Sequence, residues 1–188
     1  MSSWKDWHIP FSQDQLTLRE AKATLATLGA KQKDVPLMVQ LVENPRFHLP
    51  GVQIFHGAVD IATHDAIHIV LGRGLLSKDE AFVIGFTMGS TDNVTTLEEN
   101  LYALVSKIFY PKVYRFDADD IRIFRDAAKL GYVSDCKPLD RVDYDRYLDW
   151  PLRDVRADLG LESDLILAYY RIEQRRWPSA KASQRLLH

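Results

Sequence analysis

The segment from Thr63 to Ala81 carries the residues of this sequence that are best suited to chemistry. It holds His64 and His68 four positions apart, Asp65 directly after the first histidine, and Glu80 beyond a short break that contains two glycines. Residues i and i+4 lie on one face of a helix, so we expect the two imidazoles to point the same way. A turn at the glycines would fold a second helix back and bring Glu80 to that face. Two imidazoles and two carboxylates at one point predict a divalent metal site for zinc, iron, manganese or cobalt.

The two carboxylates of this segment have further roles open to them. Asp65 or Glu80 could leave the metal and transfer a proton, which makes both candidate catalytic residues. Glu80 also has a role that needs no metal, because Ser77 followed three residues later by glutamate is the pattern of a capping box. In that case Glu80 accepts a hydrogen bond from the Ser77 backbone N–H. The spacing leaves the ligand role and the capping role open.

The residues before the motif predict a long and mostly apolar helix. Between Val52 and Leu71 the only polar groups that titrate are His56, Asp60 and the residues of the motif. Such a helix is expected to be central, with apolar neighbours on most of its sides. A buried imidazole or carboxylate is costly unless it is hydrogen-bonded, paired or coordinated. This cost is the main physical reason to expect a partner at the motif.

Cap and stop signals predict helices along the rest of the chain, and no segment shows a convincing alternation typical of a strand. We therefore expect an all-α, single-domain bundle of about six to eight helices around a central buried helix, spanning residues 1–188. The segments 1–13 and 178–188 are expected to be peripheral tails. The predicted helices are residues 14–28, 34–43, 52–71, 77–90, 97–109, 118–130, 152–160 and 164–176.

Composition excludes several classes of protein. The net charge is −2 and no basic block is present, so nucleic acid is a poor partner. Cys136 is the only cysteine, which forbids an internal disulfide and fits a reducing compartment. The N-terminal residues lack the apolar segment of a signal peptide, and no run approaches the ~20 apolar residues of a membrane span. We expect a cytoplasmic protein, with peripheral contact at the inner face of the membrane left open.

Four large apolar side chains near the N-terminus bear on that membrane contact. They could dip into a lipid interface, but apolar side chains near a terminus more often find a groove on the core. We therefore expect core packing. The four residues are Trp4, Trp7, Ile9 and Phe11.

The motif resembles the metal-binding signature of the Coq-four family of ubiquinone (coenzyme Q) biosynthesis proteins. His64, Asp65, His68 and, after eleven further residues, Glu80 fall on the four positions of that signature, and an alanine follows the glutamate. A weaker likeness lies at 152–161, which resembles the family's LR-x-x-LG-type helix end. The resemblance is specific over the motif and loose elsewhere.

This resemblance implies a fold and a function. The fold would be all-α, with an apolar cavity beside the metal. The ligand would be a polyprenylated quinone precursor or another long apolar molecule, and the reaction would remove the ring carboxylate at C1 and hydroxylate that carbon. Other quinone-biosynthesis proteins would be partners if the protein acts as a scaffold. Phe82, Val83 and Phe86, which follow Glu80, could line a lipid groove, although core packing is the expectation we favour.

Two other functions compete with this one. The motif is similar to HExxH, in which the glutamate is the general base of a zinc protease, but here the shorter Asp65 takes that position. A metal-dependent hydrolase would need a third ligand, an open position with water and a polar cleft. The other alternative is a non-catalytic lipid-binding scaffold. The sequence leaves the oligomeric state open, a homodimer included.

Overall fold

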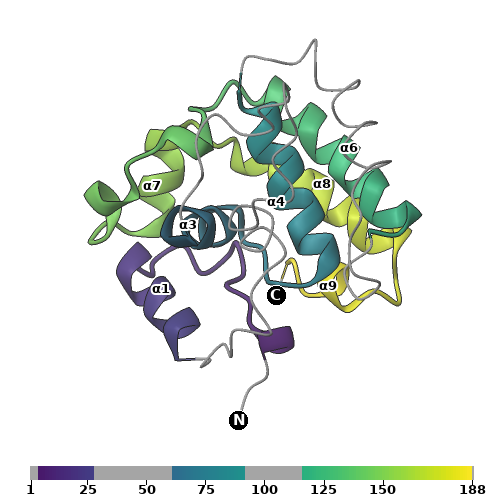
Figure 1. Ribbon diagram of the computed structural model, residues 1–188, viewed down its shortest axis with the longest axis horizontal. Helices are drawn as coiled ribbons and strands as arrows, with labels where there is room; N and C mark the ends of the chain where they lie inside the picture. The colour runs from purple at the N-terminus through teal and green to yellow at the C-terminus, as the bar shows by residue number, and fades with distance from the viewer. Residues whose placement is uncertain (1–3, 28–60, 92–115, 188) are drawn as a thin grey trace, which may run out of the picture.

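The computed structural model describes residues 4–27, 61–91 and 116–187 (Figure 1). These residues contain seven α-helices and no β-strand, which confirms the all-α prediction. The helices are α1 (Leu18–Ala26), α3 (Ile61–Leu71), α4 (Ser77–Gly89), α6 (Ala118–Val133), α7 (Leu152–Leu159), α8 (Ser163–Arg176) and α9 (Lys181–Gln184). A short 3-10 helix at Trp4–Asp6 precedes them, and two more, Leu139–Arg141 and Tyr144–Tyr147, lie between α6 and α7.

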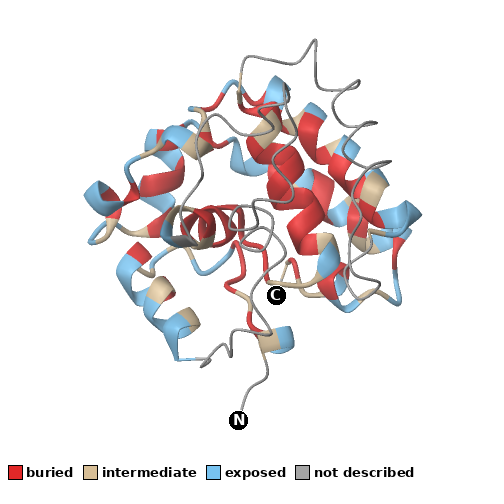
Figure 2. Cartoon of the chain, in the orientation of Figure 1, coloured by how far each residue is buried: buried red, intermediate tan, exposed pale blue. Residues whose placement is uncertain are grey.

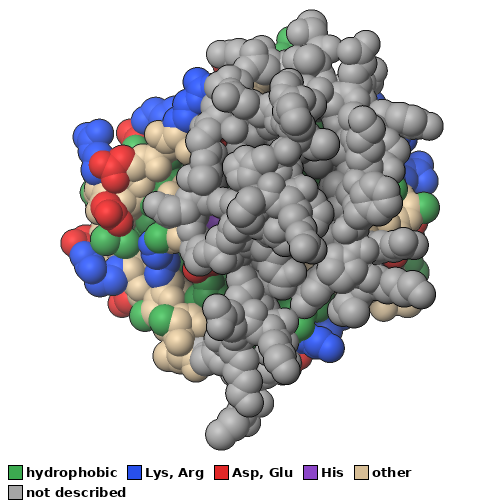
Figure 3. Space-filling model, in the orientation of Figure 1, with side chains coloured by type: hydrophobic (Ala, Val, Ile, Leu, Met, Phe, Trp, Pro, Cys, Tyr) green, Lys and Arg blue, Asp and Glu red, His purple; other side chains and the backbone are tan. Residues whose placement is uncertain are grey.

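Helices α3 and α4 form the centre of the molecule, as expected for the helix that bears the histidines. Every residue from Ala66 to Leu71 is buried, and so is every residue from Asp79 to Thr87 (Figure 2). Figure 1 shows α7 and α1 on one side of this pair and α6, α8 and α9 on the other. Charged side chains of both signs lie at the edges of the face in Figure 3. The histidines of the motif and Glu80 therefore lie inside the helical bundle.

Helices α4 and α6 approach closely because glycines stand where they meet. A Cβ at Gly85 or Gly89 would collide with a backbone carbonyl of α6, and one at Gly131 would collide with the Phe86 carbonyl of α4. The sequence predicted that Gly131 ends a helix, and this is wrong. Helix α6 continues to Val133, because this glycine serves a close helix–helix contact and not a turn.

Two of the described α-helices, α1 and α6, follow an N-cap residue whose side chain accepts a backbone hydrogen bond. Asp117 accepts one from the Asp120 N–H, and α6 begins at Ala118, where the predicted helix begins. Helix α1 begins at Leu18 and not at the predicted Asp14, since Thr17 and Glu20 form a reciprocal capping box there. Helix α7 ends at Gly160, as predicted, with φ of 75°.

The prediction of two peripheral tails is wrong in the described residues. Trp7, Ile9 and Phe11 are buried in the core, which confirms the preference for packing over membrane contact at these positions. At the other end, α9 forms and Leu186 is fully buried. The two terminal segments therefore belong to the folded domain.

Several predictions lie outside the described residues. These are the helices at 34–43 and 97–109 and the part of the central helix before Ile61. None of the helices in the described segments has the length and apolar character needed to span a bilayer.

Candidate metal centre

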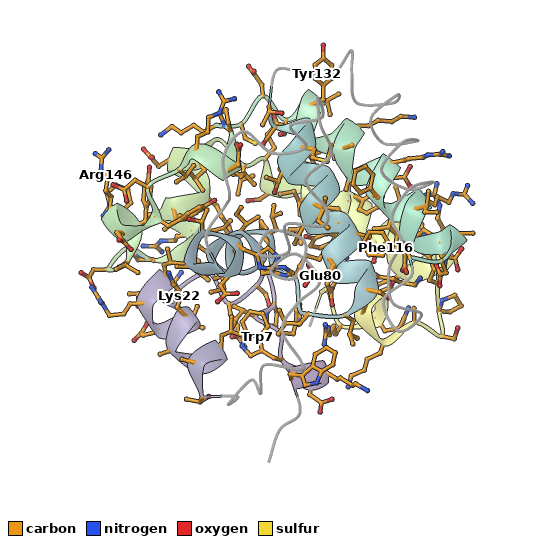
Figure 4. The ribbon with its side chains drawn as sticks, in the orientation of Figure 1. Trp7, Lys22, Glu80, Phe116, Tyr132 and Arg146 are labelled. Atoms are coloured by element: carbon orange, nitrogen blue, oxygen red, sulfur yellow. The ribbon has the colours of Figure 1, made fainter. Side chains whose placement is uncertain are left out.

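His64, His68 and Glu80 meet in a buried group between α3 and α4. The Nε2 atoms of the two histidines are 3.1 Å apart, and Glu80 lies 3.3 Å from His64 and 3.4 Å from His68. The side chains are at most 4% exposed. Figure 4 labels Glu80 beside α3, in the first turn of α4. One ligand atom from each residue lies within 4.8 Å of the others, so this group could hold a metal ion.

The chain brings these residues together by a short reversal between two helices. The i, i+4 spacing places both imidazoles on one face of α3. Gly72 then ends α3 with φ of 65°, a left-handed conformation that glycine adopts without strain. Helix α4 begins five residues later, at Ser77, and runs past α3. The predicted turn at the glycines is thus where the structure places it.

Asp79, and not Glu80, accepts the capping hydrogen bond at the start of α4. The Asp79 carboxylate accepts a hydrogen bond from the Leu76 N–H at 3.0 Å, because the helix starts one residue earlier than the Ser77 cap would require. The capping role considered for Glu80 is therefore wrong. Asp79 also forms an ion pair with Arg185. Glu80 is left to turn toward the histidines.

A backbone carbonyl fixes which nitrogen of His68 carries the proton. His68 Nδ1 lies 2.7 Å from the Gly74 carbonyl oxygen. That oxygen can only accept a hydrogen bond, so Nδ1 must donate it. In the neutral ring the lone pair is then on Nε2, which faces His64 and Glu80. This is the tautomer that a metal ligand needs, and the hydrogen bond to the Gly74 carbonyl fixes it.

The atoms that meet here are the Nε2 atoms of the two histidines and the oxygens of Glu80. All of them are acceptors when they carry no proton, so a cation or a proton is needed between them. Burial opposes a charge on His64, but the Glu80 and Asp65 carboxylates outweigh it and raise its pKa to about 9. Burial would likewise raise the pKa of Glu80, but His68 and His64 lower it well below its ordinary value. Glu80 Oε1 has no hydrogen-bond partner in the described structure, although His68 Nε2 is close. Two imidazole nitrogens and a carboxylate are a donor set used by catalytic zinc and by non-haem iron.

Asp65 is not in this group. Its Oδ1 lies 3.7 Å from His64 Nδ1, the ring nitrogen that does not face His68, and its side chain is 24% exposed. The structure thus brings together three of the four predicted ligands, and it places the fourth behind one of them. The ligand and proton-transfer roles of Asp65 stay predictions.

Sequence reasoning missed the residues that hold the end of α3. Arg156 Nε donates to the Val70 carbonyl at 2.9 Å and Arg156 Nη1 donates to the Phe11 carbonyl at 2.7 Å. Tyr170 OH donates to the Leu71 carbonyl. A cation at these carbonyls also complements the helix dipole. Arg156 lies in the segment 152–161, and its basic side chain in a partly apolar helix was the available signal.

A buried ion pair holds the loop that orients His68. Arg73 donates to both Glu173 oxygens, at 3.0 Å and 2.6 Å, and neither side chain is exposed. The Arg73 guanidinium lies over the Phe82 and Tyr170 rings, 3.8 Å and 4.3 Å from their centroids. Burial would lower the pKa of Arg73, but the Glu173 carboxylate outweighs it and raises that pKa. The loop beside Gly74 is thereby tied to α8.

The apolar residues after Glu80 pack in the core, as we favoured. Phe82, Val83 and Phe86 are at most 2% exposed, and Phe82 contacts the Phe86, Tyr169 and Tyr170 rings at centroid distances of 5.4–5.8 Å. These contacts account for the apolar side chains without a ligand. A lipid-sized cavity beside the metal stays a prediction.

The fold and the site together define an all-α protein with a buried centre of two histidines and one glutamate. No family model matches the chain, and the curated proteins and solved structures include no significant match to it. The likeness to the Coq-four family therefore rests on the motif residues and on the weaker likeness at 152–161. The function has to be inferred from the centre itself.

Proposed function

We propose that this protein holds one divalent metal ion between His64, His68 and Glu80 and uses it to bind an acidic aromatic substrate. The observation that carries the proposal is the convergence of acceptor atoms in a buried site, in which the Gly74 carbonyl orients the His68 ring. When bound, the metal supplies a Lewis acid that binds and polarises a substrate oxygen. The chain supplies the orientation of the ligands and excludes water from them.

The substrate class that we propose is a polyprenylated hydroxybenzoate-type ring, on the strength of the motif's resemblance. The carboxylate of this ring would be the acidic group that binds the metal. In the reaction the bond from C1 to the carboxylate carbon breaks and a C1–O bond forms. One ring acid, one O₂, two electrons and two protons give one phenol, one CO₂ and one water. A two-electron donor, such as a reduced flavin, has to supply the electrons.

Glu80 is the candidate for proton transfer in this proposal. It is the only carboxylate in the three-residue group, and its Oε1 has no hydrogen-bond partner in the described residues. Oε2 can therefore stay with His64 while Oε1, which lies 3.4 Å from His68 Nε2, accepts a proton. For a hydrolase of the HExxH kind, the base would be Asp65. The position of Asp65 beside His64 Nδ1 does not support that role.

The first test is the metal content of the full chain. We expect purified protein to carry about one divalent ion per chain, and we expect His64→Ala, His68→Ala and Glu80→Gln to lose it. Glu162→Gln, which changes an exposed glutamate at the start of α8, is the matched control and should keep the ion. Absence of metal from the parent protein, after dialysis against zinc, iron, manganese and cobalt in turn, would contradict the proposal.

The second test separates an enzyme from a scaffold. The metal-loaded protein is incubated with a prenylated hydroxybenzoate, O₂ and a reduced flavin. We expect release of CO₂ in a ratio of one to one with the hydroxylated ring. Binding of the ring without turnover, under conditions in which the metal stays bound, would favour the non-catalytic scaffold.

A further inference from the structure

We propose that Asp65 is a positioning residue behind His64 and not a metal ligand, so that the described residues give the ion three protein ligands, and that an anionic oxygen takes a further position on the ion. This inference rests on the proposed function, because it concerns the same metal. It differs from the four-ligand site that the sequence predicted.

Distances exclude Asp65 from the metal in the observed arrangement. Zinc ligands lie about 2.0–2.2 Å from the ion, so two N or O ligands of one ion are at most about 4.4 Å apart. The group whose ligand atoms all lie within 4.8 Å of one another contains His64, His68 and Glu80 but not Asp65. Oδ1 of Asp65 lies instead near His64 Nδ1, at 3.7 Å.

The two histidines need equivalent support on the side away from the metal. A metal on Nε2 leaves the proton on Nδ1, and metal-bound histidines almost always donate that proton to a carbonyl or a carboxylate. His68 already donates it to Gly74. His64 Nδ1 is buried and has no hydrogen-bond partner among the described residues, and the Asp65 carboxylate is the acidic group beside it. A small rotation of the Asp65 side chain would complete the hydrogen bond.

Three protein ligands leave room for a fourth. Catalytic zinc sites use three protein ligands with an open position, whereas structural sites are closed by four. The ligand that fits this position is an anionic oxygen, such as a carboxylate, because the ion carries two positive charges and Glu80 supplies only one negative charge among the three protein ligands. This position is what the proposed ring acid would use.

Cobalt(II) bound to the full chain provides the test, because its visible absorption reports the number and type of ligands. We expect Asp65→Ala to keep the absorption bands of the parent protein and to weaken cobalt binding about 10–100-fold, measured by competition with a chelator. Asp65→Asn keeps an acceptor oxygen and should recover part of the affinity. Glu80→Gln should change the bands themselves. Asp119→Ala, at an exposed position of α6, is the matched control and should change neither quantity.

A titration of the parent protein with azide or acetate tests this further position on the ion. We expect either anion to shift the cobalt bands with saturation at one anion per ion.

The inference is overturned if Asp65→Ala changes the bands as Glu80→Gln does, if Asp65→Ala leaves the affinity unchanged, or if the anions leave the bands unchanged. The first two outcomes keep the metal and therefore the proposed function. Bands that no anion shifts would also count against binding of the ring acid at the metal. Failure of the parent protein to bind cobalt, zinc, iron or manganese would remove both proposals. Alanine suits the interior of a helix, so circular dichroism should show Asp65→Ala to be folded.

Discussion

The spacing of three residues in the sequence predicted that they meet in the folded protein. These residues are His64, His68 and Glu80. The i, i+4 histidines and the acid beyond a glycine turn predicted a convergence that the structure contains. The roles of the neighbouring acids could not be predicted in the same way. Asp79 caps α4 because Leu76, and not Ser77, is the N-cap residue of that helix. Asp65 stands behind His64 because consecutive side chains of a helix point about 100° apart.

His8 is a further, partly buried histidine, and its environment makes the stability of the protein depend on pH. Burial, followed by the charge of Arg185, lowers its pKa to about 4, and its Nε2 donates to the Gly72 carbonyl at 3.0 Å. The ordinary value of 6.5 applies in the unfolded chain. Between these two values the unfolded chain binds a proton that the folded chain does not, so the stability falls as the pH is lowered through this range.

We therefore predict that His8→Gln reduces the pH dependence of stability. Between pH 7 and pH 5 the His8 contribution is a loss of about 1–2 kcal/mol in the free energy of unfolding, by the linkage of about 1.4 kcal/mol per pKa unit. Urea unfolding of both proteins at the two pH values measures it. Equal losses in parent and variant would show that His8 titrates normally in the folded protein.

At the level of elements, the end of α3 depends on a helix far along the chain. Arg156 is buried, and burial lowers its pKa to about 10, so it remains a cation at neutral pH. Its donors satisfy carbonyls of both Val70 and Phe11. Lysine lacks the planar set of donors needed to reach both. Arg156, in the segment 152–161, thus supports the end of α3. This support does not depend on the resemblance of that segment to a family.

We predict that Arg156→Met destabilises the protein by about 2–4 kcal/mol, because the side chain keeps its volume while buried carbonyls lose their donors. Arg156→Lys should fall between parent and Arg156→Met. Thermal or urea unfolding measures both, with Arg153→Met, at an exposed position of the same helix, as the control. A loss as small as that of the control would mean that water replaces the guanidinium.

The close contact of α4 with α6 at Gly89 leads to a second prediction about the helices. Gly89→Ala places a methyl group against the Ala128 carbonyl, so the helices must separate. We expect a loss of about 1–3 kcal/mol in stability, although alanine is the better helix former. Urea unfolding measures the loss. An unchanged or increased stability would show that the two helices can move apart at no cost.

At the level of the whole molecule, the ends of the chain are part of the core. The sequence suggested frayed ends because polar residues outnumber apolar ones there, and periodicity cannot be measured over so few positions. Contacts with α8 and with the start of α4 order the C-terminal end. Ser183 donates to Glu173, Arg185 pairs with Asp79, and Leu186 is fully buried. Such pairings could not be inferred from local pattern.

We predict that Leu186→Ala costs about 2–4 kcal/mol, the usual cost of emptying a leucine site in a core. Deletion of 183–188 should cost more, because Glu173 and Asp79 lose buried partners as well. Urea unfolding measures both losses. If the deleted protein were as stable as the parent, the C-terminal segment would not be part of the cooperative unit.

The hydrogen bond behind His68 has one more consequence. Its acceptor is the carbonyl of a peptide group, which every amino acid possesses, so no exchange of one side chain for another at position 74 removes that oxygen. Alanine scanning would overlook this restraint on the imidazole. A peptide-to-ester replacement between Gly74 and Leu75, made by chemical ligation, weakens the oxygen as an acceptor and reaches it directly.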